Sequence, residues 1–263
     1  MFIEKLRNVV DNSSLLRDLL YPVAVVLRWA RGRQQSRFRH YCLNLSQVLS
    51  EPVFVKIGAN DGMTGDPCSD ILLANTNWRG LLIEPVPYCF DRLRANFKDP
   101  RRFCLEQVAI GASSGEATFY YVDSKAIQSI PWLPPWFDQL GSFDRNHIAK
   151  QLDGVLGPFI IECKVRVCPL SDVLMRNRIE DVHLLHVDTE GHDYEVLKTL
   201  DFEKYAPLSI FVEHKHLSGA QRTGVVRLLR KHGYSVRNCG GDYFAVNKEA
   251  NKRLQQTART RRR

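Results

Sequence analysis

Short apolar runs alternate with amphipathic segments from residue 53 to residue 247. The apolar runs predict strands, and the 3.6-residue periodicity between them predicts helices. This alternation predicts an α/β fold with right-handed crossovers and a largely parallel sheet covered on both faces. The predicted strands are Val53–Ile57, Gly80–Glu84, Phe103–Ile110, Ala117–Val122, Ile160–Val167, Val182–Asp188 and Leu208–Glu213, and the predicted helices are Pro67–Ala74, Pro87–Phe97, Leu170–Arg178, Tyr194–Leu200 and Gly219–His232. Tyr234–Arg237 and Tyr243–Val246 flank a polar loop and predict a closing antiparallel hairpin.

The pattern changes at both ends and in one internal stretch. We expect an α/β domain over residues 51–247, an N-terminal helical extension over 1–50 and a disordered basic tail over 248–263. Leu15–Ala30 is too interrupted by charges to span a bilayer, so we expect a helix packed on the domain, with an interfacial helix as the alternative. Residues 124–159 form a long insertion, which predicts a lid or acceptor-binding loop; a cover over an exposed sheet edge is the alternative.

Charge and cysteine content narrow the function classes. The net charges of residues 1–41 and 248–263 add up to more than the +8 of the whole chain, so residues 42–247 are mildly acidic overall. This excludes a basic groove for a specific nucleic-acid partner, although the basic ends leave peripheral membrane contact open. The seven cysteines include no CxxC pair, which indicates a reducing compartment. We therefore expect a cytoplasmic protein, with the inner face of a membrane as a further possibility.

A glycine-bracketed turn follows the first strand. Gly58 and Gly62 enclose Asn60 and Asp61 at the carboxyl end of this strand, where α/β sheets bind ligands. The turn lacks the third glycine of a dinucleotide fingerprint, and Asp61 would repel a pyrophosphate. A carboxylate suits a sulfonium and an ammonium, which favours S-adenosylmethionine. The other interpretation is that the glycines serve only the turn.

The next two strands supply further candidate contacts. Glu84 ends the second strand, where a carboxylate accepts hydrogen bonds from both hydroxyls of a ribose; this suits NAD and S-adenosylmethionine equally. Gln107 and the backbone near Val108 follow in the third predicted strand, where an adenine edge would be recognised. Glu84 could instead be a surface acid.

An ordered set of motifs resembles the FkbM family of S-adenosylmethionine-dependent methyltransferases. The resemblance implies a Rossmann-like class I methyltransferase fold, with a mostly parallel seven-stranded sheet, and O-methylation of sugars or secondary metabolites. Many class I enzymes place an acid where this chain has Lys56, so the amino-acid end of the cofactor would depend on Asp61. The motifs are Ile57-Gly58-Ala59-Asn60-Asp61-Gly62, Leu82-Ile83-Glu84-Pro85, Val108-Ala109-Ile110-Gly111, Pro169-Leu170-Ser171-Asp172-Val173-Leu174 and Val187-Asp188-Thr189-Glu190-Gly191-His192-Asp193.

Two clusters qualify for the catalytic base that a hydroxyl acceptor requires. Asp188, Glu190, His192 and Asp193 follow one strand, and Glu213, His214 and His216 end the next. We expect Asp188 near both the cofactor and the reacting centre. Glu190, His192 and His214 are the other catalytic candidates, although helix capping and solvent exposure would explain several of these residues equally well. As an alternative to a protein base, oxygen atoms of Asp188, Glu190 and Glu213 could bind a divalent metal ion that acidifies the hydroxyl.

The sequence thus predicts an S-adenosylmethionine-dependent O-methyltransferase whose acceptor is a hydroxyl of a saccharide or glycoconjugate. The acceptor rests on the family resemblance. A small secondary metabolite is the alternative acceptor. A nucleic-acid or membrane adaptor that uses the basic termini is the alternative from a different functional class.

Overall fold

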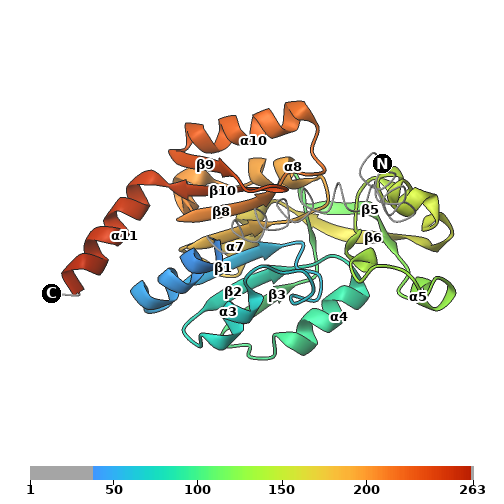
Figure 1. Ribbon diagram of the computed structural model, residues 1–263, viewed down its shortest axis with the longest axis horizontal. Coiled ribbons are helices and arrows are strands. Elements are labelled where there is room, and N and C mark those ends of the chain that lie inside the picture. Colours follow the sequence, from blue (N-terminus) through green and yellow to red (C-terminus); the bar gives the residue numbers. More distant parts are fainter. Residues whose placement is uncertain (1–37, 262–263) are drawn as a thin grey trace, which may run out of the picture.

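A computed structural model describes residues 38–261 and contains a seven-stranded sheet of order β3-β2-β1-β7-β8-β10-β9 (Figure 1). The pairs β3·β2, β2·β1, β1·β7 and β7·β8 are parallel, and β10 runs antiparallel to β8 and β9. The predicted α/β fold with a closing hairpin is therefore confirmed. The strands are β1 (Val53–Ile57), β2 (Arg79–Ile83), β3 (Phe103–Glu106), β7 (Leu184–Val187), β8 (Ser209–Glu213), β9 (Tyr234–Asn238) and β10 (Asp242–Asn247).

Alternating side chains of the parallel strands build two separate cores. Phe54 and Leu82 pack on one face with the helix over residues 38–48, α3 (Ser69–Ala74) and α4 (Pro87–Asn96). Their neighbours Val55 and Leu81 pack on the other face with α7 (Leu170–Arg176), α8 (Asp193–Lys198), α9 (Phe202–Tyr205) and α10 (Gly219–Lys231). Because successive strand residues point to opposite faces, each short apolar run fills both cores. The sheet is therefore held rigidly between two helical layers.

Part of the predicted third strand belongs to a different sheet, which corrects the prediction of one strand over Phe103–Ile110. The run divides at Gln107: β3 pairs with β2, whereas β4 (Ala109–Ile110) pairs with β6 (Ile160–Cys168). Strand β5 (Gly115–Val122) pairs antiparallel with β6, so the small sheet has the order β4-β6-β5. A local apolar pattern does not reveal which partner each half of a strand will find.

The insertion between β5 and β6 has its own core. It contains α5 (Ala126–Ser129), η1 (Phe137–Gln139), α6 (Arg145–Ala149), η2 (Gln151–Gly154) and η3 (Gly157–Phe159). Leu140, Ile148 and Leu156 are among the buried residues that hold these pieces together. Trp132 and Trp136 remain 63% and 38% exposed, so they do not form this core.

The C-terminal segment is helical, which corrects the prediction of a disordered tail. Helix α11 (Lys248–Arg261) follows β10 directly, and the Asn247 side chain accepts a hydrogen bond from Ala250 N–H. Leu254 packs against the first of the two cores. Capping and this apolar contact favour the helix despite the basic composition. The helix expected over Leu15–Ala30 lies outside the described residues.

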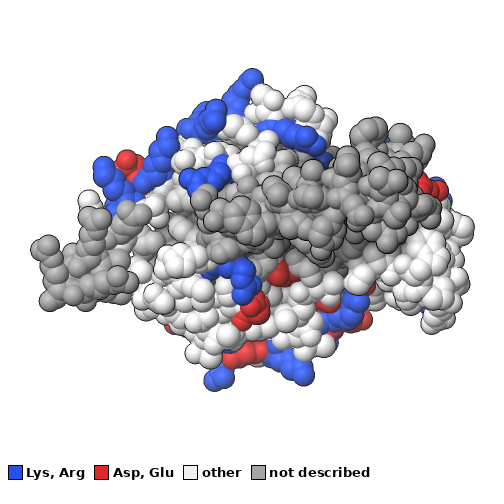
Figure 2. Space-filling model, viewed as in Figure 1, with Lys and Arg blue, Asp and Glu red and all other residues white. Residues whose placement is uncertain are grey.

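Basic side chains also gather away from the two ends. On the face in Figure 2, Lys and Arg lie along the edge formed by α10, whereas both signs mix near α3 and α4. Helix α10 contains four basic residues and no acid, and a capping box of Ser218 and Gln221 begins it. Within residues 38–261, no helix is both long enough and apolar enough to cross a membrane.

Candidate active site

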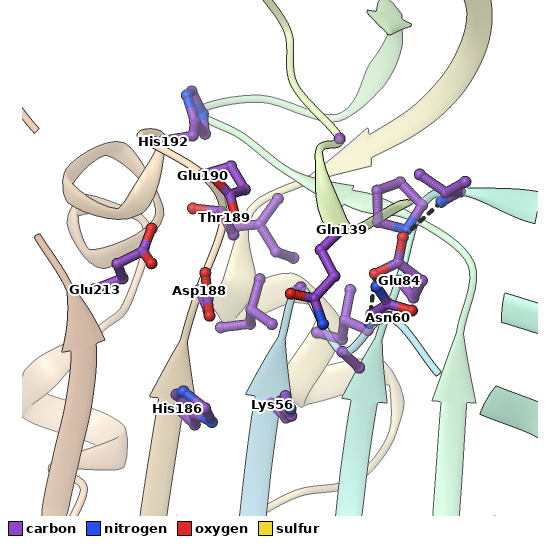
Figure 3. Close-up of a pocket in the computed structure, with 18 of the residues that line it drawn as sticks. Lys56, Asn60, Glu84, Gln139, His186, Asp188, Thr189, Glu190, His192 and Glu213 are labelled. Atoms are coloured by element: carbon purple, nitrogen blue, oxygen red, sulfur yellow. Dashed lines mark hydrogen bonds between the residues drawn. The ribbon is translucent and has the colours of Figure 1, made fainter. Parts of the chain in front are cut away.

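A cavity opens at the carboxyl ends of β1, β2, β7 and β8 (Figure 3). The chain leaves β1 toward β2 and β3, then returns to place β7 on the other side of β1. The connections diverge on either side of β1 and β7, which is the topological switch point where open α/β sheets bind ligands. The insertion closes one wall of this cavity with residues 138–143, including Gln139 and Phe143.

The glycine turn forms the floor of the cavity. Gly58 has a φ of +73°, and a Cβ there would lie 1.7 Å from the Asp188 carbonyl oxygen. The N–H groups of Gly58 and Ala59 both donate to the Ile83 carbonyl at 3.0 Å. These contacts hold the turn tightly against β2 and the end of β7. Only glycine permits this approach, and the space above the turn stays open to a ligand.

Glu84 is fixed by backbone donors at the rim of the turn (Figure 3). Its Oε2 accepts from Asn60 N–H at 2.7 Å, and its Oε1 accepts from Val86 N–H at 2.9 Å. Burial raises the pKa of Glu84 to about 7. Asn60 has a φ of +50°, and its Nδ2 is buried with no hydrogen-bond partner among the described residues. The Glu84 carboxylate, an acceptor fixed in place, and the Asn60 Nδ2 group, a donor without a partner among the described residues, therefore lie side by side in the cavity wall.

Three of the predicted cofactor contacts lie elsewhere. The Asp61 carboxylate accepts from the N–H groups of Met63 and Thr64 and from Thr64 Oγ1, so it organises its own loop. Gly62 faces Phe97, and a Cβ there would lie 2.3 Å from that ring. Asp61 and Gly62 do not line the cavity. An aspartate in a turn commonly accepts hydrogen bonds from nearby backbone N–H groups. Here these local bonds occupy the Asp61 carboxylate in place of a ligand contact.

The third correction concerns the adenine end of the predicted site. Gln107 is exposed and does not line the cavity, whereas Val108, Ala109 and Ile110 do. The break between β3 and β4 lies at this point in the chain. Backbone groups of residues 108–110 are therefore the available contacts for a base, as the alternative near Val108 anticipated.

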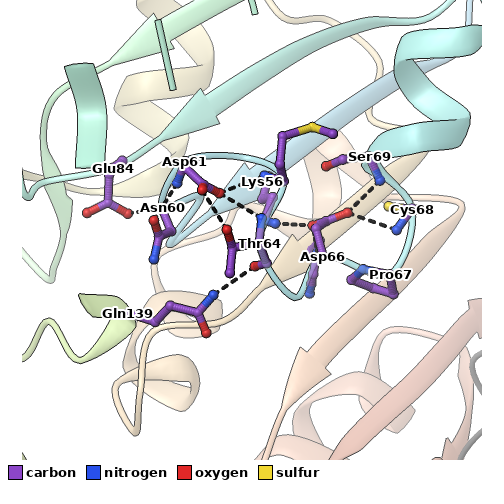
Figure 4. A network of polar contacts seen from close by, with 12 residues as sticks. Lys56, Asn60, Asp61, Thr64, Asp66, Pro67, Cys68, Ser69, Glu84 and Gln139 are labelled. Carbon is purple, nitrogen blue, oxygen red and sulfur yellow. Dashed lines mark hydrogen bonds and ion pairs between the residues drawn. The ribbon is translucent and has the colours of Figure 1, made fainter. Parts of the chain in front are cut away.

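Lys56, which the sequence pattern left without a role, forms a buried ion pair with Asp66 (Figure 4). Burial opposes the charge on Asp66, but the Lys56 ammonium and His186 hold the pKa of this carboxyl well below its usual range. The other carboxylate oxygen of Asp66 accepts from the N–H groups of Cys68 and Ser69 at 2.8 and 2.5 Å, ahead of α3. The lysine therefore anchors the loop that follows the glycine turn.

Three carboxylates converge where β7 and β8 end. One oxygen from each of Asp188, Glu190 and Glu213 lies within 4.8 Å of the others. Burial and the neighbouring Glu190 raise the pKa of Asp188 to about 6, and burial with the other two carboxylates raises the pKa of Glu213. Lys215, which was not predicted, offers its Nζ to Glu213 at 2.5 Å. The close approach of these buried acids therefore favours the protonated forms of Asp188 and Glu213.

Histidines surround this carboxylate corner, but not all of those predicted. His192 lines the cavity, and its ring lies 4.8 Å from that of Phe143. His214 is outside the cavity wall: it stacks on Tyr243 at 4.0 Å, and its Nε2 lies 3.4 Å from Asn238 Oδ1. The prediction of His214 as a catalytic residue is therefore not supported by its position, because residues 213 and 214 point to opposite sides of β8.

The loop that presents Glu190 is held from below by Asp193. The Asp193 carboxylate is fully buried and accepts from the N–H groups of Thr189 and Gly191 at 3.0 and 3.1 Å. Glu190 itself has a φ of +51°. A non-glycine residue in this conformation is strained, and the hydrogen bonds to Asp193 maintain it. As a result, Glu190 projects toward the insertion.

The sheet order, the switch-point cavity and the acid that ends β2 define a class I methyltransferase fold. The chain belongs to the FkbM methyltransferase family, because the model of that family, described as the methyltransferase FkbM domain, matches residues 56–236. The family resemblance drawn from the motifs is thus confirmed. A comparison with curated proteins finds no significant match.

Solved structures of methyltransferases are similar to this chain at low sequence identity. A methyltransferase FkbM from Methylobacillus flagellatus KT is 14% identical to this chain, with a TM-score of 0.44. The match covers 75% of this chain but only 43% of that one. A precorrin-6y C5,15-methyltransferase from Geobacter metallireducens GS-15 is 15% identical, with a TM-score of 0.36 over 82% of this chain and 85% of that one. Aeropyrum pernix fibrillarin, solved with natively bound S-adenosyl-L-methionine, is 10% identical, with a TM-score of 0.35 over 75% of this chain and 65% of that one.

The residues around the cavity fit S-adenosylmethionine, the cofactor of this family. Glu84 keeps lone pairs beyond its two backbone bonds for ribose hydroxyls, and Asn60 Nδ2 is an unused donor beside it. The carboxylate corner suits a group that is positively charged. The backbone of residues 108–110 borders the same cavity for the base.

Proposed function

We propose that this chain is an O-methyltransferase that methylates a hydroxyl group of a saccharide or glycoconjugate. The observation that supports it most is the position of Asp188, which lies at the switch point beside Gly58 and within reach of Glu190 and Glu213. When bound, S-adenosylmethionine supplies an electrophilic methyl group. The protein must then align a hydroxyl with it and accept the proton of that hydroxyl, which contributes about 10²–10⁴-fold in rate.

Asp188 is the proposed base, and Glu190 is its proposed catalytic partner. The Asp188 carboxylate would accept the hydroxyl proton as the acceptor oxygen takes up the methyl group. Burial and the negative charge of Glu190 oppose the accumulation of charge on Asp188 and so favour its protonated form. His192 lines the same cavity and is the remaining candidate for proton transfer.

The polar wall of the cavity supports a hydroxyl-rich acceptor. Gln139, Ser142 and Thr189 line it with groups that donate and accept hydrogen bonds. Gln139 is held in place because its Nε2 donates to the Thr64 carbonyl at 2.7 Å, which joins the insertion to the glycine-turn loop (Figure 4). Trp132 and Trp136, the exposed aromatic residues of the insertion, do not line the cavity.

The test is a methylation assay on fractionated glycans and metabolites with purified protein and S-adenosylmethionine. We expect a product heavier by one CH₂ in the glycan fraction, and a product in the metabolite fraction alone would favour the alternative acceptor. Asp188→Asn and Glu190→Gln should lose turnover while still binding S-adenosylhomocysteine. Asp91→Asn, an exposed change on α4, is the matched control. Full turnover in both site variants would overturn the assignment of the base.

A further inference from the structure

Three side chains from separate parts of the chain meet beside the cavity. His147 comes from α6 in the insertion, Glu190 from the loop after β7, and His216 from the loop after β8. The Glu190 Oε2 atom lies 3.5 Å from His147 Nε2 and 3.0 Å from His216 Nε2. All three ligand atoms lie within 4.8 Å of one another. Among the described residues, Glu190 Oε2 is thus approached by one imidazole from the insertion and by one from the loop after β8.

The atoms that converge here have few other contacts. Apart from the approaches to one another just given, His147 Nε2 and Glu190 Oε2 are buried and have no hydrogen-bond partner among the described residues. Glu213 Oε2 is also without one, although its side chain is only 3% exposed and lies 4.0 Å from His216 Nε2. Buried polar atoms normally find a partner, because leaving one without a bond costs about 1–3 kcal/mol. Several such atoms in one place suit a ligand that would satisfy them together.

The ring arrangement suits a metal ion. The two imidazoles stand at 85° with centroids 5.0 Å apart, so their Nε2 atoms approach Glu190 from different directions. Bonds of about 2.0–2.1 Å to zinc would separate neighbouring ligand atoms of a tetrahedral site by about 3.3 Å. The observed 3.0 and 3.5 Å lie on either side of that separation.

The backbone is shaped to allow this approach. Gly191 has a φ of +102°, and a Cβ there would lie 3.5 Å from His216 Cβ and 3.9 Å from His147 Cε1. Glu190 adopts its own strained conformation next to it. Both histidines therefore pack closely around the loop that carries the carboxylate.

We propose that His147, Glu190 and His216 bind one divalent transition-metal ion of the zinc class. Two imidazoles and a carboxylate select such an ion over Mg²⁺, which prefers oxygen ligands. Glu213 lies where it would accept a hydrogen bond from a metal-bound water, and Asp188 lies next in the same corner. The ion would join the insertion to the carboxyl ends of β7 and β8. This site differs from the carboxylate-only site on Asp188, Glu190 and Glu213.

The test measures metal binding without cofactor or acceptor, so its result is separate from that of the methylation assay. The full chain, freed of metal by chelation, is titrated with Zn²⁺ and with Co²⁺, whose visible absorption reports the ligand geometry. We expect one equivalent to bind, an increase in melting temperature, and no competition from Mg²⁺. The site borders the cavity, but its occupancy does not depend on the proposed reaction.

Variants separate this site from adventitious binding to cysteines or to the carboxylates. His147→Gln and His216→Gln should each weaken Zn²⁺ and Co²⁺ binding by more than the roughly 10–100-fold that loss of an outer-shell partner costs. His192→Gln changes a histidine of the same cavity outside the trio and should retain the affinity. Absence of saturable binding overturns the proposal, as does binding that survives both trio variants or that prefers Mg²⁺.

Discussion

Lys56 and Asp66 form a buried ion pair that ties the end of β1 to the start of α3 (Figure 4). The Lys56 side chain is 9% exposed and that of Asp66 is fully buried, so neither charge can turn to solvent if the other is removed. His186 lies beside them, with its Nδ1 3.7 Å from Asp66 Oδ2. The pair thereby holds the glycine-turn loop from beneath the cavity.

Lys56→Met should destabilise the protein strongly, because it leaves the Asp66 carboxylate buried and unpaired. The expected loss is about 3–5 kcal/mol in the free energy of unfolding, measured by chemical denaturation. Arg79→Ala is the control, since the Arg79–Glu51 pair is more than half exposed on both sides and should contribute at most about 1 kcal/mol. Equal losses in the two variants would show that the buried pair does not anchor the loop.

His186 should make stability fall as the solution becomes acidic. Burial and the adjacent Lys56 lower the pKa of His186 to about 3, below its ordinary value of about 6.5. Below about pH 6.5 the unfolded chain takes up a proton at this residue and the folded chain does not, so acid favours unfolding. The stability present above pH 6.5 is lost progressively down to about pH 3, with a slope near 1.4 kcal/mol per pH unit.

The measurement is the free energy of unfolding between pH 7 and pH 4. His186→Gln should reduce the slope of unfolding free energy against pH by about 1.4 kcal/mol per pH unit, which corresponds to one proton. His40→Gln, at an exposed histidine, should keep it. A slope that is the same in all three proteins would contradict the assignment. Asp66 acts in the same direction at lower pH, since its depressed pKa makes its contribution disappear as pH falls below about 4.

Gly58→Ala should abolish binding of S-adenosylhomocysteine. The new methyl group would lie 1.7 Å from the Asp188 carbonyl oxygen, so β1 and the loop after β7 must separate. The positive φ alone costs an alanine about 1–2 kcal/mol. Gly115→Ala is the matched control: a Cβ there meets nothing within 4 Å. Calorimetric titration and thermal melts of both variants check this, and intact binding in Gly58→Ala would refute the close approach.

Glu84→Gln should weaken cofactor binding, because the ribose hydroxyls lose a carboxylate acceptor. Loss of a charged acceptor costs about 1.5–3 kcal/mol, which corresponds to about 10–150-fold in affinity. Glu106→Gln provides the comparison, because Glu106 ends the neighbouring β3 but pairs with Arg176 at 2.9 Å outside the cavity wall. If both changes weaken binding equally, Glu84 is not a specific contact.

Features encoded by neighbouring residues were predictable from the sequence. Gly58 and Glu84 each end an apolar strand, and the parallel arrangement brings such strand ends to one edge of the sheet. The largely parallel sheet followed from the alternation of strands and helices, whereas its seven strands were implied by the family resemblance. The cavity and the positions of Asn60, Val108 and Asp188 around it are consequences of that local pattern.

Features that depend on distant partners were not predictable. Lys56 finds Asp66 in the next loop and His186 on the neighbouring strand, and no periodic pattern reports such a meeting. The sequence predicts that Asp61 contacts the cofactor. In the structure its carboxylate accepts from the N–H groups of Met63 and Thr64, and the sequence does not show these local hydrogen bonds. The trio of His147, Glu190 and His216 likewise exists only after the insertion has folded over the sheet.

The most direct test of the central claim is a calorimetric titration of the purified protein with S-adenosylhomocysteine and, separately, with NAD. Glu84 predicts a ribose contact, and the class I fold with the acidic corner around Asp188 predicts one S-adenosylhomocysteine per chain and no measurable binding of NAD. Tight binding of NAD with none for S-adenosylhomocysteine would contradict the account.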